Sequence, residues 1–214
     1  MSEQPHDTEP VTIVLATRNQ GKVRELAEPL RAFGLRVVGL DAFPDLPEVE
    51  ETGTTFEENA LLKAREVSKR TGLVAIADDS GLEVDALNGA PGVYSARYGG
   101  PGLDDAGRYR LLLENMRGVL DRKCRFVSAI TLCMPSGDIV TARGECPGTL
   151  AYAPQGENGF GYDPIFFVPE KKKTFAQLTA EEKNAISHRG RALQLFQEKL
   201  AAYLAGQKEQ SNRI

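Results

Sequence analysis

Short apolar runs alternate with stretches of helical periodicity near the start of the chain. Residues 11–17 (VTIVLAT) are nearly all apolar and rich in β-branched side chains, which is typical of a strand covered on both faces. Apolar side chains then recur at helical spacing, at Val23, Leu26, Ala27, Leu30 and Phe33. Gly34 follows where a helix C-terminus favours glycine, and residues 35–40 are predicted to form a second strand. This order predicts an α/β unit.

A second helix is predicted after an acidic connection that contains prolines. Thr54 with Glu57, or Thr55 with Glu58, can form a capping box at its start, and Gly72 is expected to end it. The apolar run LVAIA that follows predicts a strand that ends on Asp78 and Asp79. Two adjacent aspartates at the end of a buried strand are the first candidate for chemistry.

The rest of the chain continues the mixed pattern without internal repeats. We expect a helix at 104–116, two long alternating strands at 124–134 and 138–150 joined by the turn PSGD, a short strand at 165–168, and helices after Thr179 and Ser187. The predicted fold class is α/β, with a central mixed sheet flanked by helices and a cleft between two lobes. Residues 11–205 are expected to form this single two-lobed domain, between flexible tails at 1–10 and 206–214.

Composition narrows the class of protein. The chain has 214 residues, of which 41% are hydrophobic and 26% charged, as in ordinary globular proteins. No apolar run approaches the roughly 18 residues of a membrane helix, and the polar start does not read as a secretory signal, so a cytoplasmic protein without a membrane partner is expected. A net charge of −4 provides no broad basic field for nucleic acid. Three cysteines without CxxC spacing and two histidines favour neither disulfides nor zinc, so oxygen atoms would have to bind any metal.

The loop between the first strand and the first helix is a candidate phosphate site. It consists of Thr17, Arg18, Asn19, Gln20, Gly21 and Lys22. Backbone N–H groups at a helix N-terminus, together with a lysine, suit a phosphate group. The P-loop motif is absent, so an ordinary strand-to-helix turn is the alternative.

Paired acids form the second candidate site. Asp78 and Asp79, in the sequence DDSG, are consistent either with a solvated turn or with a metal site that activates water. Glu50 and Glu51 precede a glycine and could reach into a cleft beside them. Mg²⁺ needs only one or two protein carboxylates when phosphates and waters complete its coordination.

Two later segments are candidates for recognising a base. Phe160, Gly161, Tyr162 and Asp163 lie in a glycine-rich loop, where two aromatic rings next to a polar side chain resemble a stacking platform. The second segment contributes Lys183, His188 and Arg189 near a helix start. The alternatives are an ordinary loop and a solvated helix start with Ser187 as its N-cap.

Together these motifs closely resemble the inosine triphosphate pyrophosphatase family, enzymes that hydrolyse non-standard purine nucleoside triphosphates. The resemblance rests on LATRNQGKVREL, EETGTTFEENALLKA, IADDSGLEVDALNGAPGVYSARY, GFGYDPIFFVP and EEKNAISHRGRAL. These five stretches occur in the family's order and span nearly everything from Val11 to about Leu200. The family's fold, an elongated two-lobed α/β subunit that forms homodimers, agrees with the predicted fold.

The resemblance also implies roles for individual residues. Asp79 would be the catalytic carboxylate and would bind Mg²⁺ with Glu50, whereas Glu51 and Asp78 are weaker candidates as ligands. Ser80 would touch the substrate, and residues 17–22 would bind the triphosphate, with little weight on Arg18. The base would contact Phe160 to Asp163, Lys183, His188 and Arg189.

The implied reaction cleaves ITP, dITP or XTP between the α- and β-phosphates, which cleanses the nucleotide pool. A regulator that binds nucleotides without turnover, and a phosphatase that removes phosphates one at a time, are the alternatives. The intact acids at Glu50, Asp78 and Asp79 argue against the regulator, whereas residue spacing does not exclude the phosphatase.

Overall fold

A single seven-stranded sheet runs through the part of the chain that the computed structural model describes, residues 11–32 and 34–211. The expected tail at 1–10, Phe33 and residues 212–214 lie outside the described residues. The strands are β1 (Thr12–Leu15), β2 (Arg36–Gly39), β3 (Val74–Val84), β4 (Lys123–Cys133), β5 (Ile139–Leu150), β6 (Phe166–Val168) and β7 (Lys173–Thr174).

The sheet is mixed, as the sequence predicts. Its strand order is β2-β1-β3-β4-β5-β6-β7. β1 pairs in parallel with β2 and β3, whereas every later pairing is antiparallel. The long β4–β5 hairpin confirms the two alternating strands. The carboxyl end of β1, where the phosphate-loop candidate begins, pairs with Ile76 near the start of β3, two residues before Asp78.

The prediction that the third strand ends on two aspartates is wrong. β3 continues through them to Val84, and Asp78 and Asp79 pair with Ile130 and Ala129 of β4. The turn preference of Asp, Ser and Gly is therefore overridden by an antiparallel partner that supplies backbone hydrogen bonds. The solvated-turn alternative fails with it, because both aspartates are buried.

The helices follow the predicted amphipathic segments. They are α1 (Gln20–Ala32), α2 (Phe56–Thr71), α3 (Asp105–Asn115), α4 (Ala180–Ile186) and α5 (His188–Ser211). Thr55 and Glu58 form the capping box of α2, and Gly72 ends that helix at φ +68°. Ser187 Oγ accepts the Gly190 amide at the start of α5. α5 extends to Ser211, beyond the point at which the domain was expected to end.

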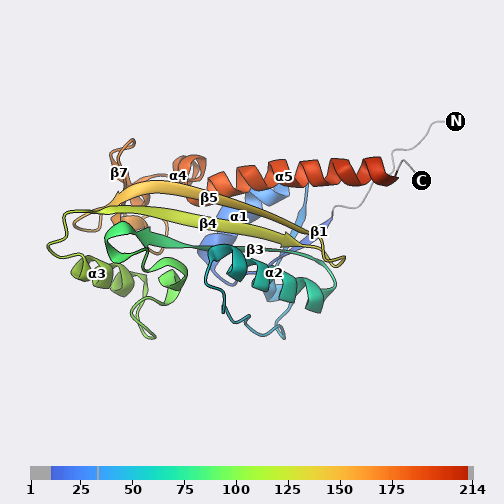
Figure 1. Ribbon diagram of the computed structural model, residues 1–214, viewed down its shortest axis with the longest axis horizontal. Coiled ribbons are helices and arrows are strands. Elements are labelled where there is room, and N and C mark those ends of the chain that lie inside the picture. The colour runs from blue at the N-terminus through green and yellow to red at the C-terminus, as the bar shows by residue number, and fades with distance from the viewer. Residues whose placement is uncertain (1–10, 33, 212–214) are drawn as a thin grey trace.

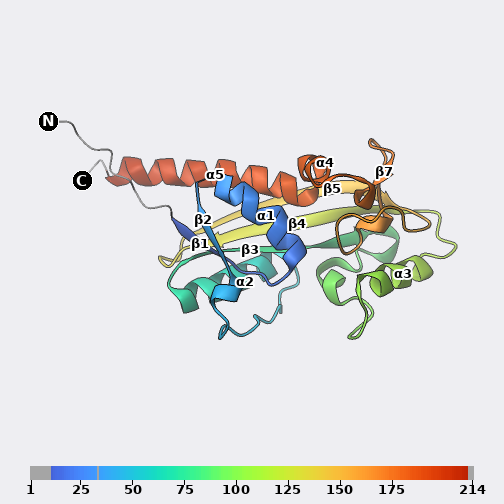
Figure 2. The same cartoon turned by 180° about the vertical axis from the view of Figure 1, so that it is seen from behind.

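Two layers of helices enclose the sheet. Leu26 of α1 and Phe196 of α5 pack on one face with Ile13 and Ile130, while α2 covers the opposite face. Figure 1 shows α5 above the long strands and α2 and α3 below them, with α3 near one end of an elongated molecule and α2 closer to its middle. Figure 2 shows α1 from the reverse side. Among the described residues, no helix is long and apolar enough to cross a membrane.

Candidate active site

A cavity of about 710 Å³ is lined by residues of both α2 and α3. Its wall includes Lys63 of α2 and Asp105 and Arg108 of α3. Most of the predicted site residues also line it, namely Thr17, Arg18, Asn19, Lys22, Glu50, Glu51, Asp79, Ser80, Phe160, Gly161, Tyr162, Asp163, Lys183, His188 and Arg189. Gln20, Gly21 and Asp78 do not form part of the wall. The fold therefore brings the phosphate loop, Asp79 and both base-recognition segments to one cavity.

The loop after β1 is shaped by its own side chains. Asn19 Oδ1 accepts the Lys22 amide at 3.1 Å, which caps the start of α1, and Thr17 Oγ1 accepts the Asn19 amide at 3.1 Å. Gly21 leaves no room for a side chain, because a Cβ there would lie 2.5 Å from the Phe160 ring. Lys22 points back across the loop to the paired acids.

Asp78 is fully engaged by donors. Its Oδ1 accepts the Ser128 hydroxyl at 2.5 Å, and its Oδ2 lies 2.9 Å from Lys22 Nζ and 3.2 Å from Arg189 Nη2. Ser80 Oγ donates to Oδ2 as well. Burial opposes ionisation, but Arg189 and Lys22 outweigh it and hold the Asp78 pKa well below its ordinary value. Asp78 is thus a permanently charged anchor, with no oxygen left free for a metal.

Unlike Asp78, Asp79 has one carboxylate oxygen that no protein group engages among the described residues. Lys63 Nζ lies 2.9 Å from Asp79 Oδ1, whereas the buried Oδ2 has no hydrogen-bond partner among the described residues. Burial raises the Asp79 pKa, and the charge of Glu51 adds to this, against the attraction of Lys63 and Lys22. A buried carboxylate oxygen on a cavity wall without a partner suits a metal ion or a water molecule.

Sequence reasoning missed Lys63 and Arg97, which complete the group around Asp79. Lys63 bridges Asp79 and Glu51, whose Oε1 lies 2.7 Å from Nζ, and Arg97 Nη1 lies 2.8 Å from Glu51 Oε2. Burial opposes ionisation of Glu51, but Lys63 lowers its pKa to about 2. Lys63 could have been identified from the sequence, because a lysine falls there among the apolar positions of the buried face of α2, beside Ala60 and Ala64.

The acids fit a magnesium ion with few protein ligands. Within residues 11–32 and 34–211, no group of three or more acidic, histidine or cysteine side chains gathers as a ready metal cage. Asp79 offers its unpartnered oxygen, and Glu50 is exposed on the same wall. Both carboxylate oxygens of Glu51 are taken by cations. One or two hard oxygen ligands are what Mg²⁺ needs beside a polyphosphate.

At the other end of the cavity, buried ion pairs join the two later segments to α1. Glu25, which sequence reasoning also missed, lies 2.7 Å from Lys183 Nζ and contacts Arg189 Nη1. Asp163 Oδ2 lies 2.5 Å from Lys183 Nζ. Burial opposes ionisation of Glu25, but Arg189 and Lys183 lower its pKa. Lys183, His188 and Arg189 are buried, which rules out the solvated helix start considered for them.

The aromatic side chains of this region occupy two environments. Both residues line the cavity, and the Phe160 ring centroid lies 4.9 Å from Lys183 Nζ. The Tyr162 side chain, however, is buried in the core, where its hydroxyl donates to Ser95 O at 2.8 Å. The two rings therefore do not form one platform. His188 stacks on Phe126 with centroids 4.6 Å apart, and burial, with Arg189 and Lys183, holds its pKa well below 6.5. His188 is neutral at pH 7.

Comparison with known proteins gives a consistent result. Residues 13–199 match the model of the Ham1 family. A protein of Exiguobacterium sp., named dITP/XTP pyrophosphatase, is 52% identical over 91% of this chain and 99% of its own length. A protein of the same name from Nitratidesulfovibrio vulgaris is 55% identical over 91% of this chain and 98% of its own.

Solved structures show the same fold. A HAM1 protein from Coxiella burnetii superposes with a TM-score of 0.83 at 44% identity, over 90% of this chain and 99% of that one. The Staphylococcus aureus Ham1 protein gives a TM-score of 0.80 at 45% identity, over 92% and 99%. The likeness therefore covers at least 90% of this chain.

Proposed function

Because the chain belongs to the Ham1 family, we propose that it hydrolyses non-standard purine nucleoside triphosphates, dITP, ITP and XTP, to the monophosphate and pyrophosphate. The observation that carries this proposal is the buried, unpartnered Oδ2 of Asp79, on a wall shared with the phosphate loop. A carboxylate placed there can take a proton from water beside a bound polyphosphate. The reaction would cleanse the nucleotide pool of the cytoplasm.

The residues near Asp79 suit attack at the α-phosphate. Water oxygen bonds to the α-phosphorus, its proton passes to Asp79, and the bond to the β-phosphate oxygen breaks, so that pyrophosphate leaves. Lys22, Lys63 and Arg97 line the same wall and offset the negative charge on the phosphates. The loop amides from Thr17 to Lys22 would orient the chain of phosphates.

Mg²⁺ is the proposed cofactor at this site. Asp79 and Glu50 would hold it, because both line the cavity and Asp79 keeps an oxygen without a partner. Glu51 is a poorer candidate, because Lys63 and Arg97 pair with its two carboxylate oxygens. When bound, the metal would lower the pKa of water and neutralise phosphate charge. The ammonium group of Lys63 lies between the Glu51 and Asp79 carboxylates and offsets part of their mutual repulsion.

Product analysis tests the proposed bond. The wild-type protein is incubated with dITP, and the products are resolved by ³¹P NMR. Pyrophosphate and dIMP in equal amounts are expected. Orthophosphate with dIDP would instead identify a phosphatase that removes one phosphate at a time. Binding of dITP without any product would identify a regulator, the second alternative.

Removal of divalent metal is expected to abolish turnover of dITP. Every candidate ligand is a hard oxygen, so Mg²⁺ should restore full activity and Mn²⁺ part of it. The measurement is the initial rate after treatment with EDTA and dialysis, with each metal then added back. Full activity in the chelated sample would show that the metal has no part in the reaction.

The partners expected from the sequence are part of the same proposal. Purine nucleoside triphosphates are the proposed ligands, with no nucleic-acid partner. The homodimer implied by the resemblance stays a prediction.

A further inference from the structure

The glycine-rich loop ends in a tight turn that presents Phe160 to the cavity. Asp163 N donates to Phe160 O at 3.3 Å, Gly161 has φ +60°, and Tyr162 has φ −88° and ψ 5°. These angles are those of a type II′ turn, in which the second position requires a positive φ and so favours glycine. The backbone from Phe160 to Asp163 therefore sets where the Phe160 ring points.

The position of that ring matters at both ends of the cavity. A Cβ on Gly21 would overlap the Phe160 ring, so the ring lies directly against the phosphate loop. Its centroid is also 4.9 Å from Lys183 Nζ and 5.7 Å from the Arg189 guanidinium carbon. A small rotation of the turn would move the ring against the phosphate loop and the base-end cations together.

Two carboxylates hold the turn, one from within the turn and one from α3. Asp163 Oδ2, within the turn, accepts the Phe160 amide at 3.0 Å. Asp105 Oδ2 accepts the Gly161 amide at 2.8 Å, although Asp105 lies in the first turn of α3, 56 positions earlier. While these bonds last, neither amide is free to bind a nucleotide, so the turn acts through its ring.

Hydrogen bonds hold the start of α3, which carries Asp105. Asp104 Oδ1 accepts the Gly107 amide at 2.7 Å and caps α3. Arg108, one turn further along, donates to Tyr98 O at 2.7 Å and Gly100 O at 3.0 Å. The start of α3 is thus tied to the neighbouring loop, and Asp105 is positioned to hold the glycine turn in place.

We propose that Asp105 is a positioning residue for the nucleotide base, and that it acts by fixing the turn that carries Phe160. This inference rests on the proposed function. Asp105 takes no part in proton transfer. Its loss should therefore weaken binding of the base and leave the chemical step nearly intact.

The test compares Asp105→Ala with Asp105→Asn. Both variants lose the same charge near the start of α3, but only asparagine keeps an oxygen that can accept the Gly161 amide. For Asp105→Ala we expect KM for dITP to rise about fivefold or more, with kcat within about twofold of wild type. Asp105→Asn should stay within about twofold in both constants. Equal impairment of the two variants, or no change in either, would overturn the inference.

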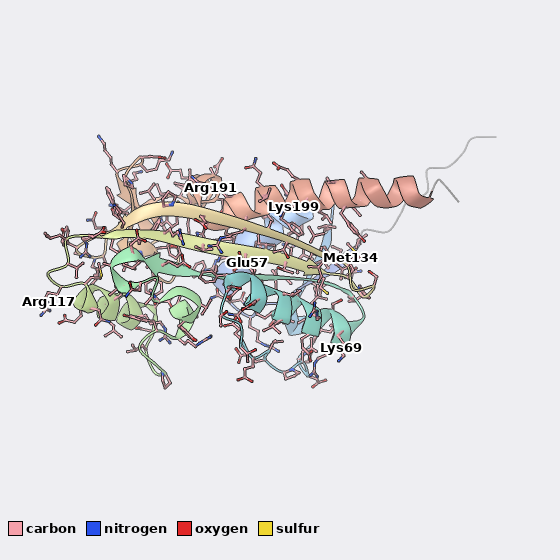
Figure 3. All side chains as sticks on the ribbon, viewed as in Figure 1. Glu57, Lys69, Arg117, Met134, Arg191 and Lys199 are labelled. Atoms are coloured by element: carbon pink, nitrogen blue, oxygen red, sulfur yellow. The ribbon has the colours of Figure 1, made fainter. Side chains whose placement is uncertain are left out.

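A second measurement does not depend on activity. Hydrogen exchange of the Gly161 amide should speed up about fivefold or more in Asp105→Ala and less in Asp105→Asn. The control is Arg117→Ala, two residues beyond the C-terminal end of α3 (Figure 3), where the Arg117 side chain pairs with Glu114 on the surface. Unchanged exchange at Gly161 in Asp105→Ala would overturn the inference. If the wild type failed to turn over dITP while exchange changed as expected, the proposed function alone would fail.

Discussion

Replacing Asp79 by asparagine is expected to lower kcat for dITP by about 10²- to 10⁴-fold, while Kd for the nucleotide stays within about tenfold. Asparagine has nearly the same size, and its amide oxygen can still accept from Lys63, which lies 2.9 Å from Oδ1. Its amide nitrogen, in place of the unpartnered Oδ2, can neither accept a proton from water nor act as a ligand for Mg²⁺. Chemistry is therefore lost while contacts with the phosphates and the base remain.

Steady-state rates and calorimetric titration with dITP measure the two quantities separately. Asp138→Asn is the matched control, because Asp138 lies in the exposed turn between β4 and β5, where its side chain accepts the nearby Ser136 hydroxyl. That control should keep kcat within about twofold. Turnover by Asp79→Asn within about tenfold of wild type would show that Asp79 is not the proton acceptor.

Local signals in the sequence were sufficient for most of the fold. The two candidate capping boxes, of which Thr55 with Glu58 forms, placed the start of α2 to within one residue, and Gly72 gave its end. Capping can be predicted in this way because it depends on neighbours only a few residues away. Alternation gave the β4–β5 hairpin for the same reason, since the side-chain period of a strand is visible in one segment. Interactions of short range in sequence are the ones that a single sequence shows.

The path of β3 through Asp78 could not be predicted in this way. Locally, DDSG favours a turn, but the Asp78 carboxylate is stabilised by Lys22, Ser128 and Arg189, which come from three other elements. Only the assembled fold supplies enough donors to bury that charge within a strand.

Long-range contacts also limited which residues of the site could be predicted from the sequence. Phe160, Lys183 and Arg189 were identified through motifs, whereas Glu25 was missed although it contacts both cations. Its contacts are 158 and 164 positions away in the sequence. A glutamate in the first turns of an amphipathic helix gives no local sign that it will be buried between a lysine and an arginine.

The preference for bases with a 6-carbonyl is the second large effect that we expect. Lys183 has three N–H donors, and Glu25 and Asp163 take two of them. Arg189 Nε is buried without a partner among the described residues, as is His188 Nδ1. Hypoxanthine and xanthine carry a carbonyl at position 6 that accepts such donors, whereas adenine presents an amino group there.

A nucleotide with adenine would therefore leave donors of the site unpaired. If two contacts are lost at roughly 1–3 kcal/mol each, kcat/KM for ITP should exceed that for ATP by about thirtyfold to ten-thousandfold. The measurement is a competition between ITP and ATP on the wild-type protein. A ratio below about five would contradict this account of base selection.

Variants of the base-end residues assign that preference to particular atoms. His188→Phe keeps the stack on Phe126, whose centroid lies 4.6 Å away, and removes both ring nitrogens. Arg189→Lys keeps a cation beside Glu25 and Asp78 and removes Nε. Each should lower the ITP to ATP ratio by about fivefold or more. Arg191→Lys is the control on the same helix, because Arg191 is exposed and donates to Glu145 O (Figure 3). If both base-end variants kept the wild-type ratio, other atoms of the site would have to select the base.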